Sequence, residues 1–237
     1  MLSDSRIYAL RPLFRINGRI FALNSLEVIH TDQYLAVVNK PGGLLAVPGR
    51  GPTKQDCVVS RIKTLFPDSI AQPAVHRLDM ATSGLMVLAF TADTHRDLSR
   101  QFSERQVEKQ YIALLEGLVE KESGEIILRF RLDPGNRPYQ IYDPIQGKTG
   151  ITQWRILNIC SDQSQPQTRI AFTPLTGRTH QLRLHAAHEL GLGCPIIGDS
   201  LYGNGKRGDS MLLHATRLAF THPITDKWLE FSSPVPF

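Results

Sequence analysis

The spacing of hydrophobic residues along the chain predicts many strands and few helices. Short apolar or alternating runs, bounded by turn residues such as Gly, Pro, Asn and Asp, are typical of strands. Two short strands are predicted on either side of a turn at 31–33, and the second ends at the Pro-Gly-Gly of 41–43. The other predicted strands cover 85–90, 109–119, 125–132, 151–159, 168–174, 211–220 and 227–231.

Three segments instead repeat apolar residues every three or four positions, as one face of a helix does. The first covers 53–68, where Thr53 is the expected N-cap and Pro67 ends the helix. The second covers 91–106, with Thr91 as its expected cap. The third covers 178–191 and is closed by Gly191.

This order of elements predicts the fold class. Strands that follow one another with few helices between them pair mostly antiparallel, which favours an α+β fold over a doubly wound parallel sheet. We expect a mixed, mainly antiparallel central sheet with flanking helices and a catalytic cleft. No repeat or linker divides residues 26–237, so we expect a single catalytic domain there, preceded by a short extension over residues 1–25.

Composition narrows the class of protein further. The 237 residues are 41% hydrophobic, and no apolar run approaches the roughly 20 residues of a membrane span. Three scattered cysteines indicate neither a disulfide framework nor a zinc ribbon, so we expect a cytoplasmic protein. The net charge of +5 is compatible with a polyanionic partner, although a slightly basic enzyme of another kind would have the same charge.

Candidate chemistry centres on the segment HRLDMATSG at 76–84, which places Asp79 between the first helix and the strand at 85–90. An Asp in a loop is usually a turn or cap residue. Here, however, a second donor-rich segment, Thr176 to Arg183, opens the third helix. A carboxylate that faces a guanidinium stays ionised, so Asp79 would act as a nucleophile or base and not as a proton donor.

Histidines of the third helix offer an alternative site. His180, His185 and His188 are spaced by five and then three residues, so only the last two share a helix face. No acid or cysteine stands at ligand spacing beside them, and no metal site is predicted. A metal-dependent hydrolase is nevertheless one of the hypotheses that the sequence leaves for testing.

Six motifs in a fixed order carry a resemblance to a known family. They are VVNKPGGLLAVPGR, HRLDMATSG, RQFSERQVEKQY, TGRTHQLRLH, PIIGDSLYG and MLLHATRLAFTHP, spread over residues 27–235. Together they resemble the RluA-type RNA pseudouridine synthases. The Met of HRLDMATSG and the Asn-Arg-Pro at 136–138 are most similar to the short, dual-specificity members, which modify large-subunit ribosomal RNA and the anticodon stem-loop of transfer RNA.

The resemblance implies both a reaction and the residues that perform it. The uracil of a chosen uridine is detached from ribose at nitrogen, turned and rejoined through carbon, without a cofactor. Matching positions imply that Asp79 is the essential carboxylate, that Tyr111 stacks on the uracil and relays a proton, and that Arg183 pairs with Asp79. Arg77 would help to open the RNA and fill the space of the extruded nucleotide, and Leu182 and Leu213 would line the apolar part of the pocket.

Many relatives carry a basic RNA-binding domain of the ribosomal S4 kind before the catalytic domain, and residues 1–25 are too few to hold one. Structured RNA, 23S ribosomal RNA or transfer RNA, would then be captured by the catalytic domain of a monomer without a protein partner. The candidate contacts are Arg96, Arg100, Arg105, Lys109 and Arg178. A rival hypothesis is a noncatalytic RNA-binding protein on the same fold. It is disfavoured because Asp79, Tyr111 and Arg183 are all present.

Overall fold

A computed structural model describes residues 14–16, 19–21, 26–160 and 165–237 of the protein. In these ranges the α-helices are α1 (Val58–Leu65), α2 (Ala92–Ser103) and α3 (Gln181–Ala187), and a short 3-10 helix, η1, covers Pro52–Lys54. The strands are β1 (Phe14–Ile16), β2 (Arg19–Phe21), β3 (Glu27–Thr31), β4 (Leu35–Lys40), β5 (Ser83–Ala89), β6 (Glu108–Glu116), β7 (Ser123–Leu132), β8 (Gln140–Tyr142), β9 (Lys148–Cys160), β10 (Gln167–Pro174), β11 (Leu213–Thr221) and β12 (Trp228–Ser232).

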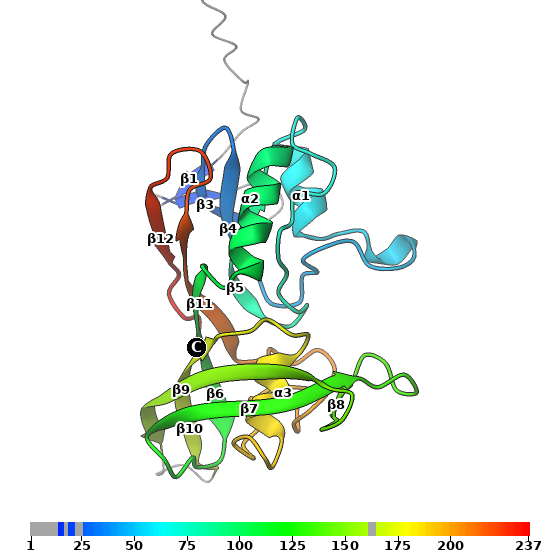
Figure 1. The fold of residues 1–237 in the computed structure, drawn as a ribbon, viewed down its shortest axis with the longest axis vertical. Helices are drawn as coiled ribbons and strands as arrows, with labels where there is room; N and C mark the ends of the chain where they lie inside the picture. The colour runs from blue at the N-terminus through cyan, green and yellow to red at the C-terminus, as the bar shows by residue number, and fades with distance from the viewer. Residues whose placement is uncertain (1–13, 17–18, 22–25, 161–164) are drawn as a thin grey trace, which may run out of the picture.

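All the named strands belong to one sheet, in the order β1-β2-β3-β4-β5-β11-β6-β10-β9-β7-β8, with β12 paired to β11. Parallel pairing joins β5 to β11, and the other pairs of named strands in the described ranges are antiparallel. The prediction of a mixed, mainly antiparallel sheet in an α+β fold is therefore confirmed. Figure 1 shows the strands in two halves, which meet where β5, β11 and β6 lie side by side.

In the half that contains β4 and β5, the sheet is covered on both faces. Side chains on a strand alternate between faces, so Leu35 and Val37 of β4 pack with Leu98 of α2, whereas Val38 packs with Ile62 of α1. Two-sided burial explains why the first four residues of this strand, Leu35 to Val38, are all apolar. The loop that carries Asp79 connects this buried region to the start of β5.

The two helices of this half begin differently. The Thr91 hydroxyl of α2 accepts a hydrogen bond from the backbone N–H of Thr94, which confirms the predicted cap. The prediction that Thr53 caps α1 was wrong, because that residue lies in η1 and the helix begins only after Cys57. Cys57 itself is the N-cap, through a hydrogen bond from the Ser60 N–H to its sulfur.

The other half packs its own core between the sheet and α3. Strands β6, β7, β9 and β10 contribute Ala113, Leu128, Trp154 and Ile170, and α3 contributes Leu184. Helix α3 is shorter than the predicted 178–191, because its backbone becomes helical only after His180 and leaves the helix at His188. The residues before it therefore form a loop that faces the centre of the sheet.

A buried amide fixes that loop against β9. Gln181 accepts hydrogen bonds from the Arg178 N–H at 3.0 Å and from the Thr176 hydroxyl at 2.7 Å. Its own NH₂ group donates to the Ile151 carbonyl at 3.0 Å and to the Thr152 hydroxyl at 2.9 Å. All four hydrogen-bonding positions of this side chain are thus used, so the start of α3 has a fixed position.

The predicted strands are otherwise confirmed, with boundaries that move by one to three residues. Strands β1, β2 and β8 had not been predicted. The first two lie within the predicted extension over residues 1–25 and continue the sheet beyond β3, while the rest of that extension is outside the described residues. No helix in the described part of the chain is long and apolar enough to cross a membrane.

Glycine is required where β5 meets β11. Gly84 pairs with Ala215, and its φ of 114° is rarely accessible to other residues. A Cβ at this position would lie only 2.5 Å from the Ala215 nitrogen, and still closer to its carbonyl oxygen. Neither atom can move without breaking the strand pairing, so the parallel pair depends on this glycine.

We expect Gly84→Ala to lower the free energy of unfolding by at least about 3 kcal/mol, from the combined left-handed strain and overlap with backbone. Gly43→Ala is a matched control, because Gly43 also has a positive φ, 83°, but a Cβ there would meet no atom within 4 Å. That variant should lose only about 1–2 kcal/mol. Urea unfolding curves measure both values, and equal losses would show that β5 and β11 do not pack as described.

Candidate active site

A pocket at the centre of the sheet brings together residues from four distant parts of the chain. Asp79 lies in the loop before β5, Tyr111 on β6, Arg183 on α3 and Leu213 at the start of β11, and all four line the same pocket. The structure therefore places Asp79, Tyr111 and Arg183 together, as the sequence analysis expected. The meeting point of the two halves of the sheet determines where the pocket lies.

The backbone on either side of Asp79 is held tightly. The Asp79 carbonyl accepts from the Thr82 N–H at 3.1 Å, and the Met80 carbonyl accepts from the Gly43 N–H at 2.9 Å. The Lys40 ammonium adds a third restraint, because it donates to the carbonyls of Met80 at 3.0 Å, Leu44 at 2.8 Å and Pro41 at 3.0 Å. Three acceptors match the three hydrogens of an ammonium group, so Lys40 fixes two loops against each other.

Lys40 is fully buried, with an exposed fraction of 0%. Burial lowers its pKa to about 7, and the negative charge of Asp79 opposes that shift. Sequence analysis assigned this residue no role. Its position at the end of an otherwise apolar strand, directly before a Pro-Gly-Gly turn, was the available signal, since a lysine there must find buried acceptors.

The Asp79 side chain is flanked by two donors without being hydrogen-bonded to either. Its Oδ2 lies 3.9 Å from Nη1 of Arg183, and its Oδ1 lies 4.0 Å from Nε2 of His180. Within the described residues, no donor reaches hydrogen-bond distance of this carboxylate, and its exposed fraction is 24%. Asp79 thus keeps free lone pairs that face the pocket, beside the positive charge of Arg183.

Arg183 has a stronger partner than the predicted one. Its guanidinium makes a bidentate pair with the buried carboxylate of Asp199, with Nε 2.7 Å from Oδ2. The expectation that Arg183 pairs with Asp79 is therefore met only through space, at 3.9 Å. Asp199 was missed, although the motif PIIGDSLYG contained it, because an Asp after Gly reads as an ordinary turn residue.

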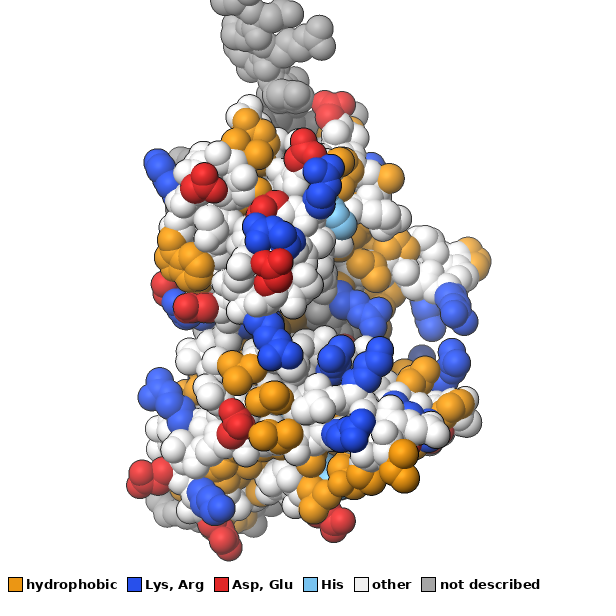
Figure 2. Space-filling model, in the orientation of Figure 1, with side chains coloured by type: hydrophobic (Ala, Val, Ile, Leu, Met, Phe, Trp, Pro, Cys, Tyr) orange, Lys and Arg blue, Asp and Glu red, His pale blue; other side chains and the backbone are white. Residues whose placement is uncertain are grey.

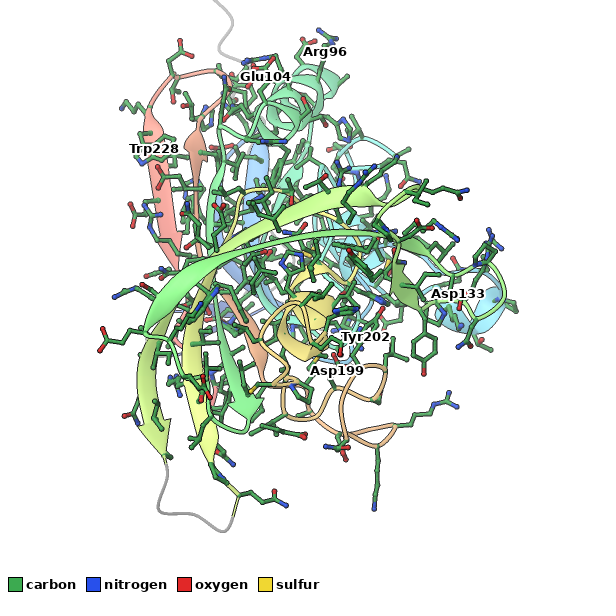
Figure 3. All side chains as sticks on the ribbon, turned by 60° about the horizontal axis from the view of Figure 1, so that its bottom comes forward. Arg96, Glu104, Asp133, Asp199, Tyr202 and Trp228 are labelled. Atoms are coloured by element: carbon green, nitrogen blue, oxygen red, sulfur yellow. The ribbon has the colours of Figure 1, made fainter. Side chains whose placement is uncertain are left out.

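Asp199 also organises the turn that follows it. Its Oδ1 accepts from the backbone N–H groups of Leu201 at 2.9 Å and Tyr202 at 3.1 Å. Burial alone would raise the pKa of Asp199, but the hydrogen bonds from Arg183 and from these two N–H groups outweigh it and hold the pKa below its ordinary value of 3.8. Figure 3 shows Asp199 and Tyr202 close together beside α3.

Tyr111 lies on β6, where its backbone pairs with Ala215 of β11, and its side chain lines the pocket. Burial, helped by the negative charge of Asp79, raises the pKa of Tyr111 well above its ordinary value. Its phenol therefore keeps its proton at physiological pH. The ring is suited to stacking, and its hydroxyl can donate a hydrogen bond.

The remaining predicted pocket residues also lie where expected. Leu182 and Leu213 are buried and line the pocket, which gives it an apolar wall. Arg77 is exposed at its rim, where its guanidinium donates to the Thr179 hydroxyl at 3.2 Å. This bond ties the loop before Asp79 to the loop before α3.

A second pocket adjoins the first and is strongly basic. The two share a wall that includes Tyr111 and Lys109. Among the residues that the structure describes, four cations line the second pocket, Arg77, Arg105, Lys109 and Arg178, and no Asp or Glu does. Lys109 lies over the ring of Phe102, with Nζ 5.7 Å from the ring centre, and burial lowers its pKa. Figure 2 shows Lys and Arg side chains across the middle of this face, between the two halves.

Two of the predicted RNA contacts lie elsewhere. Arg96 pairs with Asp93 at 2.9 Å, and Arg100 pairs with both Asp97 at 2.8 Å and Glu104 at 2.9 Å. Neither arginine lines either pocket, and Figure 3 shows Arg96 on α2, far from Asp199 and Tyr202. The structure therefore does not bring Arg96 and Arg100 to the site, and their positive charges are already balanced by neighbouring acids.

The three histidines considered as metal ligands are separated. His180 precedes α3 and faces Asp79, His185 packs against Phe130 in the core, and His188 lies near Tyr142 after the helix. In the described ranges no three His, Cys, Asp or Glu side chains are grouped so that they could hold a metal ion. The arrangement gives no support to a metal-dependent hydrolase.

A free carboxylate in a partly apolar pocket, next to a basic and acid-free wall, is typical of an enzyme that acts on a nucleotide within a nucleic acid. Comparisons with known proteins identify the family. The family model of RNA pseudouridylate synthase matches residues 34–188. The solved structure of human RNA pseudouridylate synthase domain containing 1 is similar with a TM-score of 0.72 and 29% identity, covering 90% of this chain and 84% of that one.

Curated relatives are closer in sequence. The dual-specificity RNA pseudouridine synthases RluA of Pasteurella multocida and Haemophilus influenzae are each 43% identical over 215 residues, which cover 90% of this chain and 94% of theirs. The chain belongs to the RNA pseudouridylate synthase family. It is thus an isomerase of RNA, and the predicted family, fold class and enzyme class are confirmed.

We expect Asp199→Asn to lower the free energy of unfolding at pH 7 by about 3–5 kcal/mol, because it leaves the buried Arg183 charge without its partner. Since the folded-state pKa of Asp199 is below 3.8, its contribution is complete above that pH and is lost as the pH falls through the lower folded value. Urea unfolding of both proteins between pH 7 and pH 2 would show the difference shrink in acid.

Asp93→Asn is the control, because it breaks the exposed pair with Arg96 on α2. Exposed ion pairs contribute little, so this variant should unfold like the wild type. Equal stability of Asp199→Asn and Asp93→Asn at pH 7 would contradict the assigned role of the buried pair.

Proposed function

We propose that the chain isomerises chosen uridines in structured RNA and that Asp79 is the residue on which the chemistry depends. One observation supports this most directly: the Asp79 carboxylate accepts no hydrogen bond within the described residues, yet lies between Arg183 and His180 in a pocket that also holds Tyr111. Such a group is held in place while its lone pairs stay free for a substrate.

The reaction breaks the bond between ribose C1′ and uracil N1, and the bonding electrons leave with the uracil. Positive charge develops on the sugar. Asp79 either attacks C1′ as a nucleophile, as carboxylates do in glycoside hydrolysis, and leaves again when C5 bonds to C1′, or it removes a proton from ribose as a base and returns it at the end. The uracil turns, C5 bonds to C1′, and the C5 hydrogen leaves as a proton while N1 gains one. No atom or electron is gained overall, so the balance requires no cofactor.

The pocket supplies what this reaction needs besides the carboxylate. A stacked base is out of reach, so the uridine must be flipped out at a cost of a few kcal/mol. Stacking on the Tyr111 ring offsets about 1–3 kcal/mol of that cost. We assign Leu182 and Leu213 to excluding water, which would otherwise capture the sugar, and Arg77 to filling the place of the extruded nucleotide.

The substrates follow from the relatives. Because they are named dual-specificity RNA pseudouridine synthases, we propose that this chain modifies two kinds of RNA, 23S ribosomal RNA and the anticodon stem-loop of transfer RNA. We further propose that it acts in the cytoplasm, where these RNAs are found, and as a monomer.

Asp79→Asn should abolish isomerisation because an amide can neither trap nor stabilise the sugar. The measurement is release of tritium from RNA labelled at uracil C5, with RNA binding followed in parallel by fluorescence anisotropy. We expect release to fall to background while the dissociation constant changes by less than about threefold, since Asp79 contributes no positive charge to binding.

Asp93→Asn again serves as the control, since it removes one carboxylate from exposed α2. It should release tritium at the wild-type rate. Activity that persists in Asp79→Asn would refute the assignment of this residue. Salt-sensitive RNA binding by the wild type without any tritium release would instead support the noncatalytic alternative.

We also propose that the basic pocket of Arg77, Arg105, Lys109 and Arg178 binds phosphates of the RNA next to the flipped uridine. Among the described residues no acid lines this pocket, and half-buried Lys109 makes no ion pair with a carboxylate. Both observations support the proposal, because a partly desolvated cation gains most from an anion brought by the substrate. Arg96 and Arg100 should contribute less, since acids already pair with them.

Lys109→Gln should weaken RNA binding and reduce the slope of log affinity against log salt concentration by about 0.7–0.9, the value for one lost phosphate contact. Arg96→Gln removes the positive charge that pairs with Asp93 on α2, and it should leave the slope within error of the wild type. Titrations of labelled RNA at several salt concentrations measure the slopes. A larger change for Arg96→Gln would place the RNA along α2 instead of the basic pocket.

A further inference from the structure

His180 bridges Asp79 and Tyr202. Its Nε2 lies 4.0 Å from Oδ1 of Asp79, and its Nδ1 lies 2.9 Å from the hydroxyl of Tyr202. The backbone of His180 has φ 57° and ψ 18°, a left-handed conformation that residues other than glycine seldom adopt. The imidazole is held nearly out of solvent, with 9% of the side chain exposed.

The Tyr202 hydroxyl determines which imidazole nitrogen carries the hydrogen. This oxygen already accepts a hydrogen bond from the Gln140 N–H at 2.8 Å. Burial raises the pKa of Tyr202 to about 12, so the hydroxyl keeps its own hydrogen, which needs an acceptor. Within the described residues the acceptor at hydrogen-bond distance is Nδ1 of His180. The Tyr202 O–H therefore donates to Nδ1, and Nδ1 carries no hydrogen.

The other end of the ring leads to the same tautomer. A neutral imidazole without a hydrogen on Nδ1 carries it on Nε2, which faces Oδ1 of Asp79. The opposite tautomer would direct a nitrogen lone pair at the carboxylate and leave the Tyr202 hydrogen without an acceptor. Both neighbours thus favour His180 with its hydrogen on Nε2.

We propose that His180 is a positioning residue for Asp79, held by Tyr202 in the tautomer that directs Nε2–H at the catalytic carboxylate. The proposal deepens the proposed function and rests on the role given there to Asp79. Arg183 faces one carboxylate oxygen with a full charge, and His180 faces the other with a neutral donor. The pair orients Asp79 with one cation only. A second cation would bind the carboxylate and hold it back from the sugar.

The same buried acid holds both positioning groups. Asp199 pairs with Arg183 and accepts the Tyr202 N–H, and the Arg183 guanidinium lies over the Tyr202 ring at 5.3 Å. His180 is thus oriented by a side chain that is itself fixed by the partner of Arg183. Within the described residues, the charged groups that act on His180 are Asp79, Arg183, Asp199 and Arg77. Burial lowers the pKa of His180, and the charge of Asp79 opposes that shift.

Three variants distinguish the effects of the Tyr202 hydroxyl and of the N–H donor at position 180 from effects on the shape of the site. Tyr202→Phe removes one oxygen and keeps the ring under Arg183. His180→Gln keeps an N–H donor that can reach Asp79, whereas His180→Leu has none, and both have an unbranched Cβ and similar strain at a φ of 57°. Tyr139→Phe is the control, because Tyr139 contacts the Tyr202 ring edge-on and its hydroxyl makes no hydrogen bond within the described residues.

The rate constant is measured in single turnovers with saturating enzyme and tritiated transfer RNA, so that RNA binding does not contribute. We expect His180→Leu to lower it by about 10- to 100-fold and His180→Gln by clearly less, since the N–H donor that faces the Asp79 carboxylate is lost only in the first. Tyr202→Phe should lower it by about tenfold at pH 7, and Tyr139→Phe should match the wild type.

The pH profile distinguishes this role from a merely structural one. Without the Tyr202 hydroxyl, Nδ1 is free to take a proton, so His180 becomes cationic at a higher pH. The part of the acidic fall in rate that protonation of His180 causes should therefore move to higher pH in Tyr202→Phe and vanish in His180→Gln. A profile of Tyr202→Phe that is scaled down without a shift would overturn the proposal, and so would equal losses in His180→Gln and His180→Leu.

Failure of this inference can be told apart from failure of the proposed function. An active Asp79→Asn would overturn the function, whereas wild-type rates in Tyr202→Phe, with Asp79→Asn inactive, would overturn the role of His180 alone. If both His180 variants fail to fold, as circular dichroism would show, the pH profile of Tyr202→Phe still decides the question.

Discussion

The buried ion pair between Arg183 and Asp199 is the interaction on which the site depends. Removing two charges from water is costly, and this pair is maintained because the guanidinium is bound at two points and Asp199 also accepts two backbone N–H groups. Through it, α3 is fixed to the turn at 199–202. One carboxylate therefore positions Arg183, Tyr202 and, through Tyr202, His180. Asp199 itself does not line the pocket.

Asp79 shows the opposite arrangement, and the contrast explains how two acids beside Arg183 have different roles: Asp79 lines the pocket and Asp199 does not. Asp199 is saturated with donors and buried, so it serves as a fixed counter-charge. The Asp79 backbone is restrained through Lys40 and Gly43, yet its carboxylate has donors only at 3.9 and 4.0 Å. The main chain around Asp79 is rigid, whereas its side chain makes no hydrogen bond within the described residues. The carboxylate is therefore fixed in position and still free to react.

Much of this arrangement was predictable from sequence, and the errors have physical reasons. Periodicity located nearly every strand and all three α-helices, and the motifs singled out Asp79, Tyr111 and Arg183, which line one pocket in the structure. Thr53 was wrongly expected to cap α1 because a cysteine, an unusual cap, took that position. Asp199 and Lys40 were missed because each looks ordinary in its own segment. Their roles arise from partners that only the folded chain brings within reach, whereas the acids that pair with Arg96 and Arg100 stand three or four residues away along the chain.

The parallel contact between β5 and β11 also has a consequence for how the enzyme comes to exist. Ser83 and His214, which are hydrogen-bonded at this contact, are separated by 131 positions in the chain. Closing so long a loop is entropically costly, so contacts of this kind form after local ones during folding. Each half can collapse around its own core beforehand, but neither half alone has a complete pocket. Catalytic competence is therefore acquired only once β11, which contributes Leu213 to the pocket, has paired with β5.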